Sequence, residues 1–527
     1  MSDLQLYPFS PPSDLILKAQ QEIADHEATI TVLQKQLDVL ILQARRIEDE
    51  KKKHISAIIK CRSLLTLASR LPGELLARIF EYAVQDGWTR GPIVVSQVCS
   101  SWREAAKMPS VWSHVYIDCD KGDPVARCEL WLQMARQSPL YVTFRTSEYR
   151  PKVEAAFSSI LSRIDYWRTL VLEAPSIYTI NRLLEHIIST GPLLQSISIK
   201  LGGSPVDDPL PDIVQGQARL DGFRQAFANA LGLRRVSFQT DTAQSWCGVS
   251  QITSLELQLN ECQLTNARPI FFSEIFDVLS ESPNLRRLTM NISLKDKREV
   301  IQDTPLRIVT LPEMDSLTLN IPVHFMAFLQ HFRTPKLRKL YLRSPDDPQG
   351  FADETTRAAL CAFIDLCAPP LETLELYDVD ISQDDFLFWF TSLSSLTELR
   401  LHGSDILDET LIHLKSPFGL LPNLRFLDLR WCGHISGITL EELAYARSSV
   451  CGSGLLTPLS EITVINCSFV NEKHILGISN YSTCRLKVHD DNDFCVRRGC
   501  CDNIRYRMRF RSRVKMSEHQ SANIILS

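Results

Sequence analysis

The chain has 527 residues, of which 44% are hydrophobic and 23% are charged, and its formal net charge is -5. This length exceeds what one hydrophobic core can organise, so we expect about three domains or one long array of repeats. So mild a charge does not point to nucleic acid, a membrane or any other class of partner. No apolar run reaches the ~18 residues of a membrane span, and the N-terminus lacks the pattern of a signal peptide. We therefore expect no membrane partner and a location in the cytoplasm or nucleus.

The first 60 residues divide into two segments. Residues 1–14 contain three prolines and no periodicity, which predicts a disordered N-terminus. Residues 15–60 lack glycine and proline, and their apolar residues recur every seven positions, which predicts a coiled-coil-like helix of about five heptads. The two seam positions are occupied by Ile16, Ile23, Ile30, Leu37 and Ala44, and by Ala19, His26, Leu33, Leu40 and Ile47. His26 and the two alanines weaken the seam, so a homodimer and a helix packed on its own chain both remain open.

The next segment has more apolar surface than short helices can bury. "LPGELLARIFEYAVQDG", residues 71–87, predicts a helix that begins after Pro72 and whose apolar residues cover about half its circumference. "IVVSQVCSSWREAAK", residues 93–107, predicts a second helix with a similarly wide apolar face, and "SVWSHVYI" adds a third short piece. Three small helices cannot bury two such faces on one another. A partner, or the rest of the chain, must complete the burial.

Three blocks in this region carry a family resemblance. "LPGELLARIF" (71–80), "VCSSWR" (98–103) and "VW" (111–112) resemble the F-box in order and spacing, which places an F-box at residues 64–118. With the preceding helix, the chain is similar to a group of fungal F-box proteins, although the named motifs cover only about a tenth of it. The resemblance implies binding to a Skp-type adaptor, which joins F-box proteins to a cullin and so to a ubiquitin-conjugating enzyme.

By this resemblance the adaptor would contact Leu71, Pro72, Leu75, Ile79, Phe80, Val98, Cys99, Trp102 and Trp112. About half of these side chains could instead form the core of the F-box itself. The sequence does not distinguish the two groups.

A repeated strand pattern dominates residues 140–490. An apolar residue, two variable residues, an apolar, a variable and an apolar residue recur eleven times at intervals of 19 to 39 residues. The copies begin at Trp167, Leu194, Leu233, Ile252, Leu285, Met314, Leu337, Leu371, Leu396, Leu424 and Leu459. This spacing is typical of irregular leucine-rich repeats, each one strand and one helix, and an ordinary parallel α/β protein is the alternative. Asn260, Cys432 and Cys467 match the buried polar or thiol position of such repeats, and Pro/Gly/Asp-rich insertions at 202–212 and 344–350 are expected to be loops.

We therefore predict the α/β class: a long N-terminal helix, a short three-helix F-box and an irregular leucine-rich-repeat solenoid. Aligning four consecutive repeats gives two rows of variable side chains. The first row, Tyr341, Glu375, Arg400 and Asp428, alternates in charge, and its members are expected to neutralise one another. The second row contains no acidic residue and is predicted to bind a carboxylate or phosphate of the target, because guanidinium groups bind both. Its members are Arg343, Tyr377, His402 and Arg430, for which a solvated rim is the alternative.

The segment 491–527 ends the chain. Within it, "NIRYRMRFRSRVK" alternates basic and apolar residues, which predicts a terminal strand with one basic face. We favour a solvated edge for this face, because basic side chains on an edge strand discourage aggregation. A patch for nucleic acid or an acidic protein is the alternative.

No catalytic, cofactor or metal site is predicted. The chain contains no phosphate-binding glycine loop, no G-x-S-x-G, no H-E-x-x-H and no paired Cys or His ligands. The 15 cysteines are scattered, and the cluster of Cys495, Cys500 and Cys501 lacks zinc-finger spacing, so reduced thiols are expected. "CGSG", residues 451–454, reads as a loop between repeats.

The sequence therefore predicts a non-catalytic substrate-recognition subunit of a Skp-cullin-F-box ubiquitin ligase, with the repeats binding a target protein. The alternative is a coiled-coil scaffold or nucleic-acid-associated protein that uses the C-terminal basic strand. Co-purification of the adaptor distinguishes the two hypotheses.

Overall fold

A computed structural model describes most of the chain. The described residues are 13–65, 71–188, 191–201, 221–227, 229–240, 251–259, 270–292, 300–301, 307–344, 354–415, 419–449, 456–465, 467, 469–470 and 472–485. Several predictions fall outside these residues: the N-terminal segment up to residue 12, the insertion 202–212 and nearly all of 344–350, Asn260, the "CGSG" loop, and the C-terminal basic strand and tail with Cys495, Cys500 and Cys501. The chain divides into two compact units, residues 1–83 with 90–107 and residues 84–89 with 108–527.

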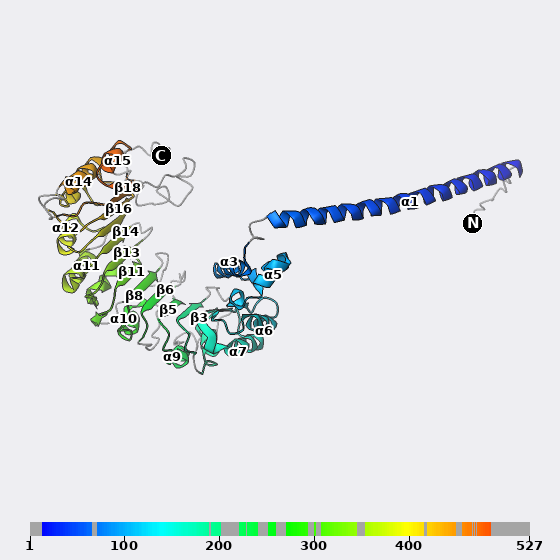
Figure 1. Cartoon of the computed structure of the whole chain (residues 1–527). Coiled ribbons are helices and arrows are strands. Elements are labelled where there is room, and N and C mark those ends of the chain that lie inside the picture. The colour runs from blue at the N-terminus through cyan, green and yellow to red at the C-terminus, as the bar shows by residue number, and fades with distance from the viewer. Residues whose placement is uncertain are drawn as a thin grey trace, which may run out of the picture. The chain divides into compact units, whose positions relative to one another are not determined.

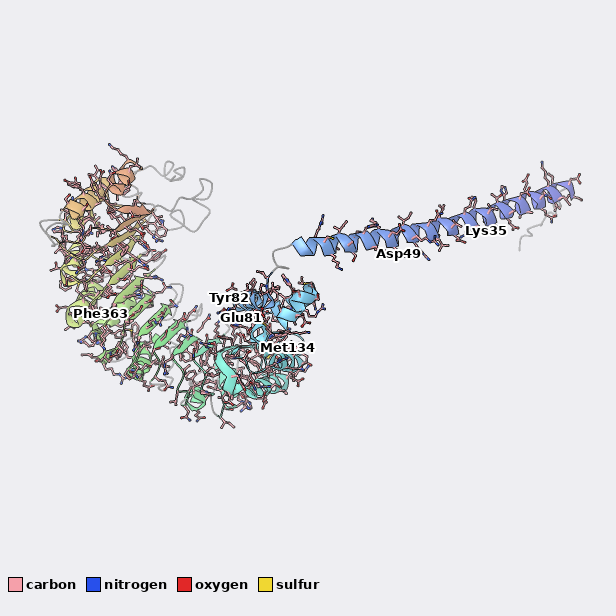
Figure 2. All side chains as sticks on the ribbon, in the orientation of Figure 1. Lys35, Asp49, Glu81, Tyr82, Met134 and Phe363 are labelled. Carbon is pink, nitrogen blue, oxygen red and sulfur yellow. The ribbon has the colours of Figure 1, made fainter. Side chains whose placement is uncertain are left out.

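The first unit contains one long helix, α1, Ser13–Leu65, of 53 residues (Figure 1). The absence of glycine and proline from residues 15–60 allows this length, and the predicted N-terminal helix is confirmed. Its apolar seam is exposed: Leu33 is 57% exposed and Leu40 60%. Figure 2 shows its side chains, Lys35 and Asp49 among them, projecting from all around the helix. Among the helices that the structure describes, none combines the length and apolarity of a membrane span.

The first unit also contains three short helices, α3, Gly73–Gln85, α4, Gly91–Val98, and α5, Ser100–Ala106. The second helix expected over 93–107 is therefore two helices, which is a correction. Cys99 interrupts it in an extended conformation, with φ -156° and ψ 174°. The Arg103 Nε group donates to the Ser96 carbonyl oxygen at 2.8 Å, which satisfies an acceptor that the interrupted helix leaves open.

The second unit is built on a parallel sheet of 14 strands in the order β1-β2-β3-β4-β5-β6-β8-β11-β13-β14-β15-β16-β17-β18. These strands are β1, His114–Asp118; β2, Leu140–Arg145; β3, Trp167–Ala174; β4, Ser196–Leu201; β5, Arg235–Thr240; β6, Ser254–Leu259; β8, Arg287–Ile292; β11, Ser316–Asn320; β13, Lys339–Arg343; β14, Thr373–Tyr377; β15, Glu398–His402; β16, Phe426–Arg430; β17, Glu461–Ile465; and β18, Thr483–Arg485. Two short parallel pairs accompany it, β7, Ile270–Phe271, with β9, Val300–Ile301, and β10, Val309–Thr310, with β12, Phe332–Arg333.

Helices connect most of the strands. The α-helices are α6, Pro124–Ala135; α7, Pro151–Leu161; α8, Ile177–Leu184; α9, Asp221–Phe227; α10, Phe272–Ser280; α11, Glu354–Cys367; α12, Gln383–Ser392; α13, Asp408–Ile412; α14, Gly437–Ser449; and α15, Glu472–Ser479. The 3-10 helices are η1, Pro109–Trp112; η2, Ile164–Tyr166; and η3, Val323–His331. In Figure 1 the helices α9 to α15 follow one face of the sheet, and the strands form the other face.

The alternation of side chains explains this arrangement. In β4, Ile197, Ile199 and Leu201 are at most 3% exposed and face the helices, whereas Ser196 and Ser198 lie on the other face. All eleven predicted repeats form strands of this sheet, so their positions are confirmed, and β1, β2 and β18 extend it. The parallel sheet is consistent with a solenoid. Phe363, labelled in Figure 2, is one of the helix residues buried over it, at 1% exposure.

The thiols of the later repeats are buried as expected. The Cys432 Sγ atom lies 3.3 Å from the Leu401 carbonyl oxygen of the preceding strand, and the Cys467 Sγ atom lies 3.7 Å from that of Leu429. Each thiol therefore supplies a weak donor to the end of a neighbouring strand. This contact accounts for the small polar residue at that position.

One buried arginine holds the last repeats together. Arg447 of α14 is 0% exposed, and its guanidinium donates to six backbone carbonyl oxygens, including those of Leu414 at 3.1 Å, Leu421 at 2.9 Å and Thr457 at 3.0 Å. Burial lowers the pKa of Arg447 to about 10, so the group stays charged at neutral pH. One side chain thus satisfies the carbonyl groups of two connecting segments.

We predict that Arg447→Met destabilises the second unit by about 3 kcal/mol, because the substitution leaves several buried carbonyl oxygens without a donor. Thermal and denaturant unfolding of the full chain would measure the loss. Arg425→Met, at an exposed position nearby, is the matched control and should have little effect. Equal stability of the two variants would contradict the role assigned to Arg447.

Candidate functional site

The apolar surface of α3 is divided into a buried and an exposed part. Leu76 and Phe80 are at most 3% exposed, whereas Leu75 is 52%, Ile79 50% and Tyr82 55% exposed. The three exposed residues are spaced i, i+4 and i+7, so they form one stripe along the helix. The wide apolar face inferred from the sequence is therefore only half covered in this chain.

The buried part of α3 packs on α5. The rings of Phe80 and Trp102 lie 5.0 Å apart at an interplanar angle of 54°, a separation typical of aromatic pairs. On α4, Val94 is 40% and Val98 57% exposed, and Cys99, which follows the helix, is exposed as well. The first unit therefore presents apolar residues on α3 and on α4, which we call the F-box apolar residues: Leu75, Ile79, Tyr82, Val94 and Val98.

The nine residues predicted to bind the adaptor fall into three classes. Pro72, Leu75, Ile79, Val98 and Cys99 are exposed, Leu71 and Trp102 are half-buried, and Phe80 and Trp112 are buried. Trp112 of η1 packs against Trp131 of α6 with ring centroids 5.1 Å apart. Sequence reasoning did not include Tyr82 and Val94, although helical spacing from Ile79 and from Val98 could have identified them.

The predicted target-binding row lies in register across four strands. Arg343 pairs with Tyr377, Tyr377 with His402, and His402 with Arg430. The expectation that acidic groups do not neutralise this row is wrong, because Arg343 donates through Nε to Glu375 Oε1 at 2.6 Å. The sequence treats the rows as separate, whereas arginine is long enough to reach the carboxylates of the adjacent row.

The carboxylates of the first row hold the arginines of both rows. Glu375 is 3% exposed and also accepts from Arg400 Nη1 at 3.2 Å, which confirms the expected pairing of these two residues. Asp428 accepts from Arg430 in a bidentate arrangement at 2.8 and 2.7 Å and lies 3.7 Å from His402 Nε2. Burial alone would raise the pKa of Asp428, but the nearby His402 ring and the bonds from Arg430 lower it to about 2.

An aromatic group adjoins these ion pairs. Tyr377 lies edge-on to His402 at 5.5 Å, and Trp431 lies 6.2 Å from Tyr377 and 6.4 Å from His402. Trp431 follows β16 with φ +54°, at the position where Gly403 follows β15 with φ +65°. A tryptophan in the left-handed region is unusual, and no feature of the sequence pattern identified it in advance. Among the described residues, no group of three or more His, Cys, Asp or Glu is arranged to hold a metal ion.

We predict that Asp428→Asn lowers the free energy of unfolding by about 2 kcal/mol at pH 7. Because the folded-state pKa of Asp428 is depressed, its contribution is present above about pH 4 and is lost as the pH falls towards about 2. Denaturant unfolding of both proteins at pH 7, 4 and 3 would show the difference shrinking with acidity. Glu409→Gln, at an exposed carboxylate, is the control. A difference that stays constant with pH would contradict the ionic role of Asp428.

Comparisons with known proteins agree with the first unit of this site. The family model for F-box-like domains matches residues 68–118, about a tenth of the chain. No curated protein matches the chain. Among solved structures, it is similar to a chain in the crystal structure of the Rad7 and Elc1 complex in yeast, at 15% identity over 82% of this chain and 97% of that chain, with a TM-score of 0.28. A likeness at that score carries no argument about function. The F-box-like domain at residues 68–118 is the assignment that the comparisons support.

Proposed function

We propose that this protein is a substrate-recognition subunit of a Skp-cullin-F-box ubiquitin ligase. The main support is the match to the F-box-like domain at residues 68–118, in which helix α3 leaves Leu75 and Ile79 half-exposed. Apolar side chains in that pattern stabilise a complex when a partner removes them from water, at ~25 cal/mol per Å² of buried apolar surface. The F-box would bind a Skp-type adaptor and through it a cullin.

The second unit supplies the rest of the proposed subunit. Its parallel sheet and helix-covered face support the interpretation as irregular leucine-rich repeats, and the face without helices would bind the target protein. Arg343, Tyr377, His402 and Arg430, which line one part of that face, are proposed target contacts. In this role the chain performs no chemistry itself, because transfer of ubiquitin follows from proximity.

Helix α1 is a candidate for pairing with a second copy. Its exposed seam carries isoleucine at three of five places in one heptad position and leucine at two of five places in the other, and isoleucine opposite leucine favours two-stranded coiled coils. We include a homodimer through α1 in the proposed assembly.

We expect Leu75→Asp with Ile79→Asp to abolish adaptor binding, because each substitution would bury an unpaired charge in the interface. Both positions are about half exposed in this chain, so the fold should tolerate the change. The measurement is co-purification of the adaptor with the full chain, together with thermal unfolding of both proteins.

The matched control is Gln133→Asp with Gln137→Asp, which adds the same two charges at exposed positions of the second unit. This control should keep adaptor binding. If the Leu75/Ile79 variant has the thermal stability of the wild type and still binds the adaptor at the wild-type level, the proposed function is wrong.

We expect Arg343→Ala with Arg430→Ala to reduce target capture and to leave adaptor binding unchanged. Enrichment of ubiquitylated proteins from cells that express each variant would measure target capture. Arg150→Ala with Arg182→Ala removes two arginines that are likewise paired with nearby glutamates and is the control. Equal enrichment by wild type and the first variant would exclude these two arginines as target contacts.

A further inference from the structure

Three rows of side chains cross five neighbouring strands on the face of the sheet that carries no helices. The strands are β5, β6, β8, β11 and β13, drawn in green in Figure 1. They pair without a shift in register, so equivalent residues line up across all five. We name the rows by their chemistry: an amide row, a hydroxyl row and a basic row.

The amide row consists of four carboxamides on the adjacent strands β5, β6, β8 and β11, and Arg343 holds the equivalent position on β13. Register pairs Gln239 with Gln258, Gln258 with Asn291, and Asn291 with Asn320. Within the described part of the chain, no hydrogen bond involves these four side chains. Each offers one acceptor and two donors, and a peptide group needs one of each. A row of free carboxamides therefore matches the main chain of an extended peptide.

The hydroxyl row lies two residues before the amide row on each strand. It contains Ser237, Thr289, Thr318 and Tyr341, with Glu256 between the first two. The Ser237 hydroxyl donates to Glu256 Oε2 at 3.3 Å. The serine and threonine side chains of this row are small, whereas Glu256 and Tyr341 extend further from the sheet.

The basic row lies two residues earlier again. Arg235, Arg287 and Lys339 are exposed and alternate with Ser254 and Ser316. No ion pair to these three cations forms within the residues that the structure describes. Because Glu256 is the single described acidic side chain on this face of the five strands, the surface is net positive. A partner segment with acidic side chains complements it.

The dimensions fit one extended chain. Four residues along a strand separate the amide and basic rows by ~13 Å, which accommodates a main chain whose side chains reach the cations. Four strands at ~4.8 Å spacing make the amide row ~14 Å long, the length of an extended segment of four or five residues. The rows are therefore matched to a short peptide that crosses the strands.

We infer that this face binds an extended acidic peptide segment of the target. The carboxamides of Gln239, Gln258, Asn291 and Asn320 pair with its peptide groups, and Arg235, Arg287 and Lys339 pair with its acidic side chains. This inference rests on the proposed function, because it names what the ligase subunit recognises. A single-stranded nucleic acid fits less well, since two of the five strands carry serine in the basic row and Glu256 faces the middle of the surface.

The test begins with a display library of random twelve-residue peptides selected on the purified full-length protein. We expect the selected peptides to be acidic. The best peptide is then resynthesised in three forms: with each Glu or Asp replaced by its amide, with acidic residues replaced by phosphoserine, and with alternate peptide nitrogens methylated. The amide and N-methylated forms should bind at least about tenfold more weakly, because they lose the charge and the main-chain donors, respectively. The phosphoserine form shows whether phosphate can replace carboxylate as the anionic group.

Two protein variants assign the contacts. Gln239→Leu with Gln258→Leu, Asn291→Leu and Asn320→Leu should weaken the unmodified peptide at least about tenfold and remove the penalty of N-methylation. Arg235→Gln with Arg287→Gln and Lys339→Gln should weaken it similarly and remove the preference for acidic over amide forms. Each variant has a matched control at exposed positions elsewhere, which should bind the peptide normally. The control for the amide row is Gln133→Leu with Gln137→Leu, Gln225→Leu and Asn229→Leu. The control for the basic row is Arg136→Gln with Lys152→Gln and Arg425→Gln.

Peptide binding is measured without the adaptor, so the two proposals fail separately. If the wild-type protein binds the peptide but does not bind the adaptor, the result counts against the ligase role alone. The inference is overturned if the selected peptides are not acidic or if N-methylation has no effect. It is also overturned if the amide-row and basic-row variants both fold and bind the peptide as tightly as their controls. A twelve-nucleotide oligothymidylate that binds more tightly than the best peptide, and depends on the same cations, would also overturn it in favour of nucleic acid.

Discussion

The second unit depends on strands that pair in parallel and in register, with one shift among the described pairs, at Leu140/Tyr141 between β2 and β3. Because side chains alternate between the two faces of a strand, in-register pairing carries each apolar residue to the helix-covered face and each polar residue to the other. Leu399, Leu427 and Ile462, on three neighbouring strands, are all at most 1% exposed. A slip of one residue would bury the arginines and glutamates of the adjoining positions, so the core and the polar rows are fixed by the same pairing.

The same register turns a linear sequence into a two-dimensional surface. Residues that are tens of positions apart, such as Gln258 and Asn291, become neighbours across one strand spacing. Towards β14 to β16 the surface is a closed network of ion pairs centred on Glu375 and Asp428. Over β5 to β11 it carries amides that form no hydrogen bonds with described residues. In the first region the charged side chains are paired with one another, whereas the second has hydrogen-bonding capacity available for a ligand.

The sequence predicted the strands well because an apolar alternation repeated eleven times is a strong local signal. It also predicted the long helix, which the seven-residue periodicity and the absence of glycine and proline indicate together. It failed where the outcome depends on side-chain reach or on backbone conformation. The sequence pattern predicts that each row interacts only within itself. In the structure, Arg343 is long enough for its guanidinium to reach Glu375 in the adjacent row. Cys99 looks like an ordinary helix residue in the pattern, yet its extended backbone separates α4 from α5. Which apolar residues of α3 are covered could not be decided locally, since burial depends on segments distant in the chain.

The length of α1 has a mechanical meaning of its own. A straight helix of 53 residues extends ~80 Å, more than twice the ~30 Å diameter of a small domain. A protein bound near Ile23 would therefore be held some tens of ångströms from Leu65, beyond the reach of most surface loops. In such an arrangement α1 acts as a spacer, and shortening it by whole heptads would bring bound partners closer by ~10 Å per heptad.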